Sequence, residues 1–216
     1  DGSITYHVKS EPGVDWGLNT DVKNPVVILA AGASSRMKSV EGVSEDIAKE
    51  VTSRPKAMLR VGDGEIPFLE LLLKRIKKEG SNCVIVVVGE KDHITEKYFS
   101  SNHIEGLEIR YVVQTIPQDR NKPLGTANAV ERALLSNTDL SNHSIVVCNG
   151  DNMPPEESFS EIFKFNCAML AYDSSKLGLP EDRVSVFSVV DIDSEGYLKQ
   201  IIEKPTKEAL PNFIQS

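Results

Sequence analysis

The chain has 216 residues, of which 40% are hydrophobic and 26% are charged, values ordinary for one soluble globular domain with or without an appendage. Its 24 basic and 32 acidic residues leave a net charge of −8, which argues against a general affinity for nucleic acid or an anionic membrane. Any anionic substrate must therefore be held by a few well-placed cations.

The cysteines, the histidines and the apolar runs exclude further classes of protein. Cys83, Cys148 and Cys167 are odd in number and form no C-x-x-C pair, so we expect free thiols in a reducing compartment. The four histidines show no metal-ligand spacing, which argues against a zinc site. No apolar run approaches the length of a membrane span, about 20 residues, and we expect no signal peptide. We expect a soluble, cytoplasmic protein and leave its oligomeric state open.

Residues 1–24 show no sustained hydrophobic period and are interpreted as an N-terminal extension, followed by a domain over residues 25–216. That domain alternates apolar runs, typical of buried parallel strands, with amphipathic segments typical of helices. In chain order we expect a strand at 26–30, a helix at 68–79, a strand at 84–88, a helix at 94–99, a strand at 109–113, a helix at 127–135, a strand at 145–148, a helix at 157–165 and a strand at 168–171.

This alternation predicts an α/β fold with a Rossmann-like, mostly parallel sheet between helices and right-handed crossovers. After residue 183 the pattern changes. Residues 184–190 and 197–202 flank a turn signal at 193–196, which predicts a small β-hairpin. Ligands of such sheets bind beyond the carboxyl ends of the strands, so the loops there are the candidate sites.

The first of these loops follows the strand at 26–30 and has the properties of a phosphate site. Small residues let backbone N–H groups approach an anion, and Arg36 supplies a fixed cation. A dinucleotide-binding fingerprint and a Walker loop are both absent. A tight turn with an incidental arginine is the alternative for this loop taken alone. Its candidate residues are Leu29, Ala30, Ala31, Gly32, Ser34, Ser35 and Arg36.

Four further features follow in order along the chain. Lys56 stands just before an apolar segment, and Gln114 ends the third strand. Gly125 and Thr126 open a helix, so that helix N–H groups and the glutamine amide can face one ligand. Asp151 places a carboxylate at the carboxyl end of the fourth strand. Glu203 and Lys204 close the hairpin with an acid and a base side by side.

Over roughly residues 25–205 the sequence resembles the sugar-phosphate nucleotidyltransferases, which make nucleotide sugars. The resemblance rests on the LAAG-x-x-SRM loop, PKAML, Q…LGTA, GD and EKP. It implies transfer of a nucleotidyl group from a nucleoside triphosphate to a sugar 1-phosphate, with Mg²⁺ and with release of pyrophosphate. A cytidylyltransferase for a non-sugar phosphate and a non-catalytic regulatory nucleotide-sugar binder are the alternatives.

The resemblance also implies a role for each candidate residue. Residues 31–36 would hold the triphosphate, with Arg36 on the leaving pyrophosphate and Lys56 at the reacting phosphate. Gln114, Gly125 and Thr126 would recognise the base, and Asp151 would bind Mg²⁺. Glu203 would bond a sugar hydroxyl and Lys204 the sugar phosphate. In the family the fold continues past the EKP strand, so we expect this domain to be incomplete at its C-terminus and slow on its own.

Overall fold

A computed structural model gives the structure of the chain and describes residues 5–7, 21–32, 53–62, 66–173, 176, 187–203 and 205–206. The chain forms two compact units. The larger comprises Asp15–Pro154, and the smaller comprises Asp1–Val14 with Pro155–Ser216. A domain boundary at residue 25 stays a prediction.

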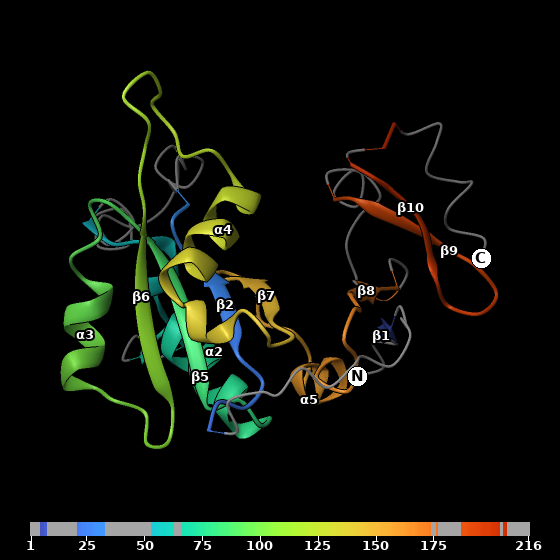
Figure 1. Ribbon diagram of the computed structural model, residues 1–216, viewed down its shortest axis with the longest axis horizontal. Helices are drawn as coiled ribbons and strands as arrows, with labels where there is room; N and C mark the ends of the chain where they lie inside the picture. The colour runs from blue at the N-terminus through green and yellow to red at the C-terminus, as the bar shows by residue number, and fades with distance from the viewer. Residues whose placement is uncertain are drawn as a thin grey trace. The chain divides into compact units, whose positions relative to one another are not determined.

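The larger unit is built on a parallel sheet with the strand order β6-β5-β2-β7 (Figure 1). The bounds are β2 Val26–Leu29, β5 Cys83–Gly89, β6 Glu108–Gln114 and β7 Val146–Asn149. Each neighbouring pair is parallel, which confirms the predicted Rossmann-like sheet. The two central strands, β2 and β5, are apolar because residues on both of their faces are buried.

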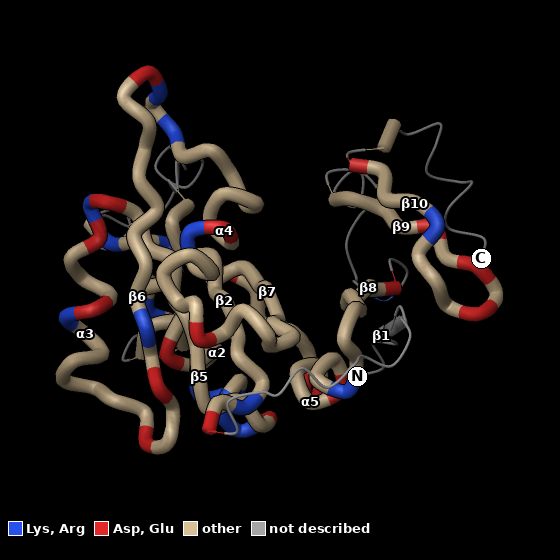
Figure 2. Tube along the Cα trace, in the orientation of Figure 1, with Lys and Arg blue, Asp and Glu red and all other residues tan. Residues whose placement is uncertain are grey.

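Charged side chains lie around this sheet and not within its centre. Figure 2 shows Lys, Arg, Asp and Glu on the helices and loops, with none on β2, β5 or β7. The edge strand β6 carries Glu108 and Arg110 at its start, and Arg110 pairs with Glu108 and with Asp139. These ion pairs lie at the end of the sheet opposite to the strand ends that carry the candidate residues.

Helices cover the sheet where the sequence predicts them. They are α2 Phe68–Lys78, α3 Thr95–Ser101 and α4 Thr126–Ser136. Helix α2 buries Leu69, Leu72, Leu73 and Ile76 completely. The spacing of these residues along the sequence is the pattern that predicted the helix. Helix α4 lies in front of the sheet in Figure 1 and packs on β2, β5 and β6. Its buried residues Ala129 and Ala133 are small, so the helix axis can approach the strands closely.

Short elements that the sequence pattern did not indicate connect these parts. They are the 3-10 helices η2 Lys56–Met58 and η3 Thr138–Leu140, and the paired strands β3 Arg60–Val61 and β4 Ile66–Pro67. None of the helices in the described ranges is long and apolar enough to cross a membrane. The three cysteines are free, as expected.

In its described residues the smaller unit contains helix α5 Ser158–Ile162 and four short strands. Strands β9 Val189–Ile192 and β10 Leu198–Ile202 pair antiparallel and form the predicted hairpin. Its turn is stabilised by Asp193, whose Oδ1 accepts hydrogen bonds from the backbone N–H groups of Glu195 and Tyr197.

One strand of the smaller unit differs from the expectation. The strand predicted at 168–171 is present as β8 Leu170–Tyr172, but it pairs antiparallel with β1 Thr5–His7 and does not extend the parallel sheet. An apolar run predicts burial and not the identity of the partner strand. The pairing with a segment from the start of the chain was therefore missed.

Candidate active site

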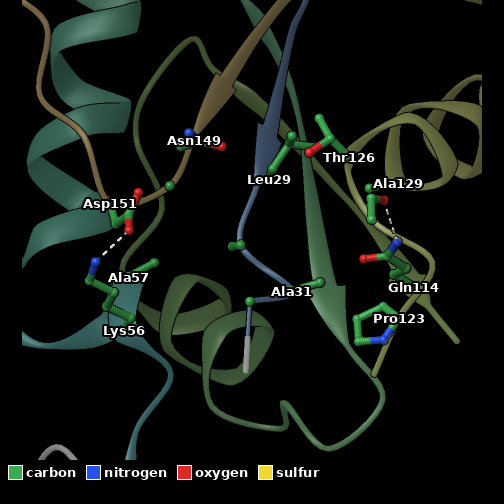
Figure 3. A pocket seen from close by; sticks show the side chains of 14 residues that line it. Leu29, Ala31, Lys56, Ala57, Gln114, Pro123, Thr126, Ala129, Asn149 and Asp151 are labelled. Carbon is green, nitrogen blue, oxygen red and sulfur yellow. Dashed lines mark hydrogen bonds and ion pairs between the residues drawn. The ribbon is translucent and has the colours of Figure 1, made fainter. Parts of the chain in front are cut away.

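The larger unit contains a pocket of about 470 Å³ at the carboxyl ends of β2, β6 and β7 (Figure 3). It opens where the strand order reverses, the position at which open α/β sheets bind ligands. Its lining residues are Leu29, Ala30, Ala31, Gly32, Lys56, Ala57, Gln114, Pro123, Gly125, Thr126, Ala129, Asn149, Gly150 and Asp151.

Two loops at the base of the pocket are hydrogen-bonded to neighbouring strands. The N–H of Ala30 donates to the carbonyl of Val87 at 2.8 Å, and the N–H of Gly150 donates to the carbonyl of Leu29 at 2.9 Å. A Cβ at position 150 would be crowded: it would lie 3.2 Å from Ile28 Cγ2 and 3.3 Å from Ala30 Cβ, so these neighbours would have to shift by a few tenths of an ångström. Gly150 thus allows the loop after β7 to pass close to β2 and sets the position of Asp151.

One side of the pocket holds an ion pair between Lys56 Nζ and Asp151 Oδ2 (Figure 3). Lys56 begins η2, whose next two residues, Ala57 and Met58, are buried and anchor the turn. The side chains of Lys56 and Asp151 are 44% and 35% exposed, so both stay accessible to a ligand. A cation and a carboxylate at one point can serve a phosphate and a metal ion respectively.

The opposite side of the pocket holds the amide of Gln114, whose residue is only 4% exposed. Its Nε2 donates to the carbonyl of Gly125 at 2.9 Å and to Asn128 Oδ1 at 3.2 Å. In Figure 3 the nitrogen bonds toward α4 and the oxygen points into the open space of the pocket. This side therefore presents a neutral hydrogen-bond acceptor.

Helix α4 begins at this side of the pocket. Gly125 precedes it with φ of 108°, a conformation that glycine adopts readily, and no side chain caps the helix. The first N–H groups of α4 have no partner within the helix, and the helix dipole adds partial positive charge there. Thr126, the first helical residue, lines the pocket.

One known protein family matches most of the chain. The sequence model of the nucleotidyl transferase family matches residues 25–216. The chain belongs to this family.

Two named relatives align with most of this nucleotidyl transferase. The bifunctional protein GlmU of Methanococcus maripaludis is 31% identical over 186 residues, 86% of this chain and 37% of that protein. D-glycero-alpha-D-manno-heptose 1-phosphate guanylyltransferase of Campylobacter jejuni is 26% identical over 185 residues, 84% of this chain and 69% of that protein. The chain thus spans little more than a third of the first relative.

The crystal structure of HddC from Yersinia pseudotuberculosis shares the fold. It superposes on this nucleotidyl transferase with a TM-score of 0.55 and 22% identity, covering 85% of this chain and 71% of that one. The complex of HddC with GMP-PN gives a TM-score of 0.53 at 23% identity.

The pocket of this nucleotidyl transferase brings together most of the candidate residues that the structure describes. Glu203 follows β10 in the smaller unit. Ser34, Ser35, Arg36 and Lys204 lie outside the described residues. The candidate residues that line the pocket are Leu29, Ala30, Ala31, Gly32, Lys56, Gln114, Gly125, Thr126 and Asp151.

Several lining residues were not among the predicted ones. Asn149 and Gly150 directly precede Asp151, so their position after an apolar run was a usable signal. Ala129 lies one turn after Gly125 on α4, a spacing that also places it on the pocket side. Ala57 stands inside the PKAML motif, from which no role was inferred for it, and Pro123 carried no local signal.

Proposed function

We propose that this chain transfers a nucleotidyl group from a nucleoside triphosphate to a sugar 1-phosphate and releases pyrophosphate. The observation that carries the proposal is the division of the pocket. Lys56 and Asp151 lie on one side, and Gln114 with the start of α4 lies on the other. A nucleotide has the same two ends, a polyanionic phosphate chain and a base with hydrogen-bonding edges.

The base would lie against Gln114, Gly125 and Thr126. Gln114 Oε1 offers an acceptor to an N–H of the base, while Gly125 and the uncapped helix start offer backbone groups. The triphosphate would then extend along the loop after β2 toward Lys56. Within that loop Ala31 and Gly32 line the pocket, and Gly32 leaves open space where a side chain would stand. Ser34, Ser35 and Arg36 would continue the phosphate site.

Asp151 would be the carboxylate that holds Mg²⁺. The described part of the chain contains no group of three His, Cys, Asp or Glu side chains that could hold a metal ion. A single carboxylate nevertheless fits this metal, because Mg²⁺ keeps several waters and is commonly bound through one or two carboxylates plus substrate phosphates. Bound there, the ion would supply charge neutralisation to the phosphates.

The proposed reaction is an in-line displacement at the α-phosphorus. A phosphate oxygen of the sugar 1-phosphate forms a bond to that phosphorus, and the bond to the bridging oxygen of the β-phosphate breaks with release of pyrophosphate. The second pKa of a phosphate monoester is about 6, so the nucleophile is already ionised near neutral pH and needs no general base. Lys56 and Arg36 would act by positioning and by neutralising charge.

The sugar phosphate would be held by Glu203 and Lys204. A carboxylate accepts hydrogen bonds from sugar hydroxyls, and a lysine suits a phosphate as a point charge. The named relatives include a heptose 1-phosphate guanylyltransferase, which supports a sugar 1-phosphate as the acceptor.

The proposal includes a cytoplasmic location. The free cysteines agree with it, because the cytoplasm keeps thiols reduced.

The proposal is tested by pyrophosphate release from ATP, GTP, CTP and UTP, each with a panel of sugar 1-phosphates and Mg²⁺. We expect release that depends on both one nucleotide and one sugar 1-phosphate, and a nucleotide sugar as the second product. Release with a phosphorylated amino alcohol but with no sugar 1-phosphate would contradict the assignment of the acceptor. Tight binding of a nucleotide sugar without turnover in either direction would indicate a regulatory binder.

A further inference from the structure

The Gln114 amide is held so that only its oxygen faces the pocket. Its two N–H groups are matched by two acceptors, the carbonyl of Gly125 at 2.9 Å and Asn128 Oδ1 at 3.2 Å. A backbone carbonyl can only accept, so the nitrogen of Gln114 must be the atom that faces it. The oxygen is consequently directed the other way, into the pocket, as Figure 3 shows.

The orientation of Asn128 is set in turn by Glu131, one turn further along α4. Asn128 Nδ2 donates to Glu131 Oε2 at 3.2 Å. An ionised carboxylate accepts only, so Asn128 must present its nitrogen to Glu131 and its oxygen to Gln114. Residues three apart on a helix are neighbours on its surface, so Asn128 and Glu131 can form this hydrogen bond within a regular α4.

We propose that Asn128 is a positioning residue for selection of the nucleotide base. The proposal rests on the proposed function, in which Gln114 faces the base. By occupying the second N–H of Gln114, Asn128 leaves the site with an acceptor and no donor at this position. A base is then favoured when it presents an N–H to Gln114 Oε1 and disfavoured when it presents a carbonyl or an unprotonated ring nitrogen.

Removal of the acceptor at position 128 would change the character of the site. Gln114 would keep its bond to Gly125, but its second N–H would be unpaired and free to donate. The amide would then offer a donor as well as an acceptor to the ligand. A site that offers both a donor and an acceptor can bind bases with different hydrogen-bonding edges, because fewer of these bases leave a polar group unpaired.

Two nearly isosteric substitutions separate this role from a structural one. Asn128→Asp retains an oxygen that accepts from Gln114, whereas Asn128→Leu removes it. Dissociation constants are measured by calorimetry for ATP, GTP, CTP, UTP and inorganic tripolyphosphate, which carries no base. We expect the ratio between the weakest and the tightest nucleotide to fall about fivefold in Asn128→Leu, the scale of one hydrogen bond. In Asn128→Asp the ratio is retained, and tripolyphosphate affinity stays unchanged in both variants.

A substitution of Glu131 gives a second test that does not depend on how well Asn128→Leu folds. Glu131 lies on the exposed surface of α4, where a substitution disturbs the fold little. Glu131→Leu should lower the selectivity ratio when residue 128 is asparagine, whose amide needs orienting. It should have no effect in the Asn128→Asp background, because both oxygens of a carboxylate accept.

The inference is overturned by an unchanged ratio in folded Asn128→Leu or in Glu131→Leu, or by an equal loss of affinity for tripolyphosphate. It is also overturned if the wild-type protein binds all four nucleotides equally. A wild-type protein that binds none of the nucleotides contradicts the proposed function itself. The two failures are therefore distinguishable.

Discussion

Lys56 Nζ lies 2.5 Å from Asp151 Oδ2, although 95 residues separate the two in the sequence. Both side chains are well exposed, and exposed ion pairs of this kind contribute only about 0–1 kcal/mol to stability. The pair therefore holds the fold together only weakly. Under the proposed function, Lys56 would exchange Asp151 for a phosphate of the substrate, and Asp151 would exchange Lys56 for Mg²⁺.

Asp151→Asn should abolish most of the catalysis while leaving the fold intact. We expect turnover to fall about 100-fold or more, the scale of losing one strong electrostatic stabiliser. The melting temperature should change little, because the lost ion pair is exposed. The measurement is kcat over a titration of Mg²⁺. The control is Asp119→Asn, on the exposed loop before α4, which should behave as wild type. Turnover near the wild-type value at millimolar Mg²⁺ would remove Asp151 from the mechanism.

Lys56→Ala should act on the chemical step more than on binding. Lys56 is expected at the reacting phosphate, where negative charge develops, so single-turnover rates should fall about tenfold to 100-fold. The dissociation constant of the nucleoside triphosphate should change much less. Lys91→Ala, at an exposed position after β5, is the matched removal of a positive charge and should leave both quantities unchanged. If nucleotide binding falls as much as the rate, Lys56 contributes uniform binding and has no special role at the transition state.

Gly150→Ala should lower both stability and activity. The added Cβ would lie 3.2–3.3 Å from atoms of Ile28, Leu29 and Ala30, which belong to or adjoin a fully packed strand. Forcing one methyl group into such a region costs about 1–3 kcal/mol of unfolding free energy.

Gly89→Ala is the control, because a Cβ there meets only the carbonyl of Ala31 at 3.8 Å. Urea denaturation of the two variants measures the difference. Equal midpoints would show that the loop after β7 moves freely away from β2.

The native protein should show one rapidly reacting thiol at pH 8. Burial raises the pKa of the Cys83 thiol to about 11 and that of the Cys148 thiol to about 12. Both pKa values lie well above pH 8, so the reactive thiolate form of either residue is scarce there. Cys167 is exposed.

A chromogenic disulfide reagent should therefore label one thiol, that of Cys167, quickly. It should label the other two thiols, those of Cys83 and Cys148, slowly. Cys167→Ser should remove the fast phase, and denaturant should make all remaining thiols react quickly. A fast phase that survives Cys167→Ser would show that Cys83 or Cys148 is reached through opening of the native structure.

The sequence by itself was sufficient to predict the parallel sheet and the helix that the structure shows over Phe68–Lys78. Strands such as Val26–Leu29 and Cys83–Gly89 are apolar without interruption, and Leu69, Leu72, Leu73 and Ile76 recur at helical spacing. The buried face of each strand or helix requires apolar residues at a regular spacing within that segment. The spacing can therefore be recognised in the sequence without knowledge of the rest of the fold. Residues directly after such strands, including Asp151 and Gln114, could be recognised as candidates for the same reason.

Only the tertiary structure decided which distant residues meet. The pairing of β8 with β1, the approach of Lys56 to Asp151 and the fit of Gly150 against Ile28 depend on the relative placement of remote segments. The direction of the Gln114 amide likewise depends on two acceptors, the carbonyl of Gly125 just before α4 and the side chain of Asn128 on α4. Hydrogen bonds and close packing act over a few ångströms in space, and hydrophobic periodicity along the chain carries no information about those distances.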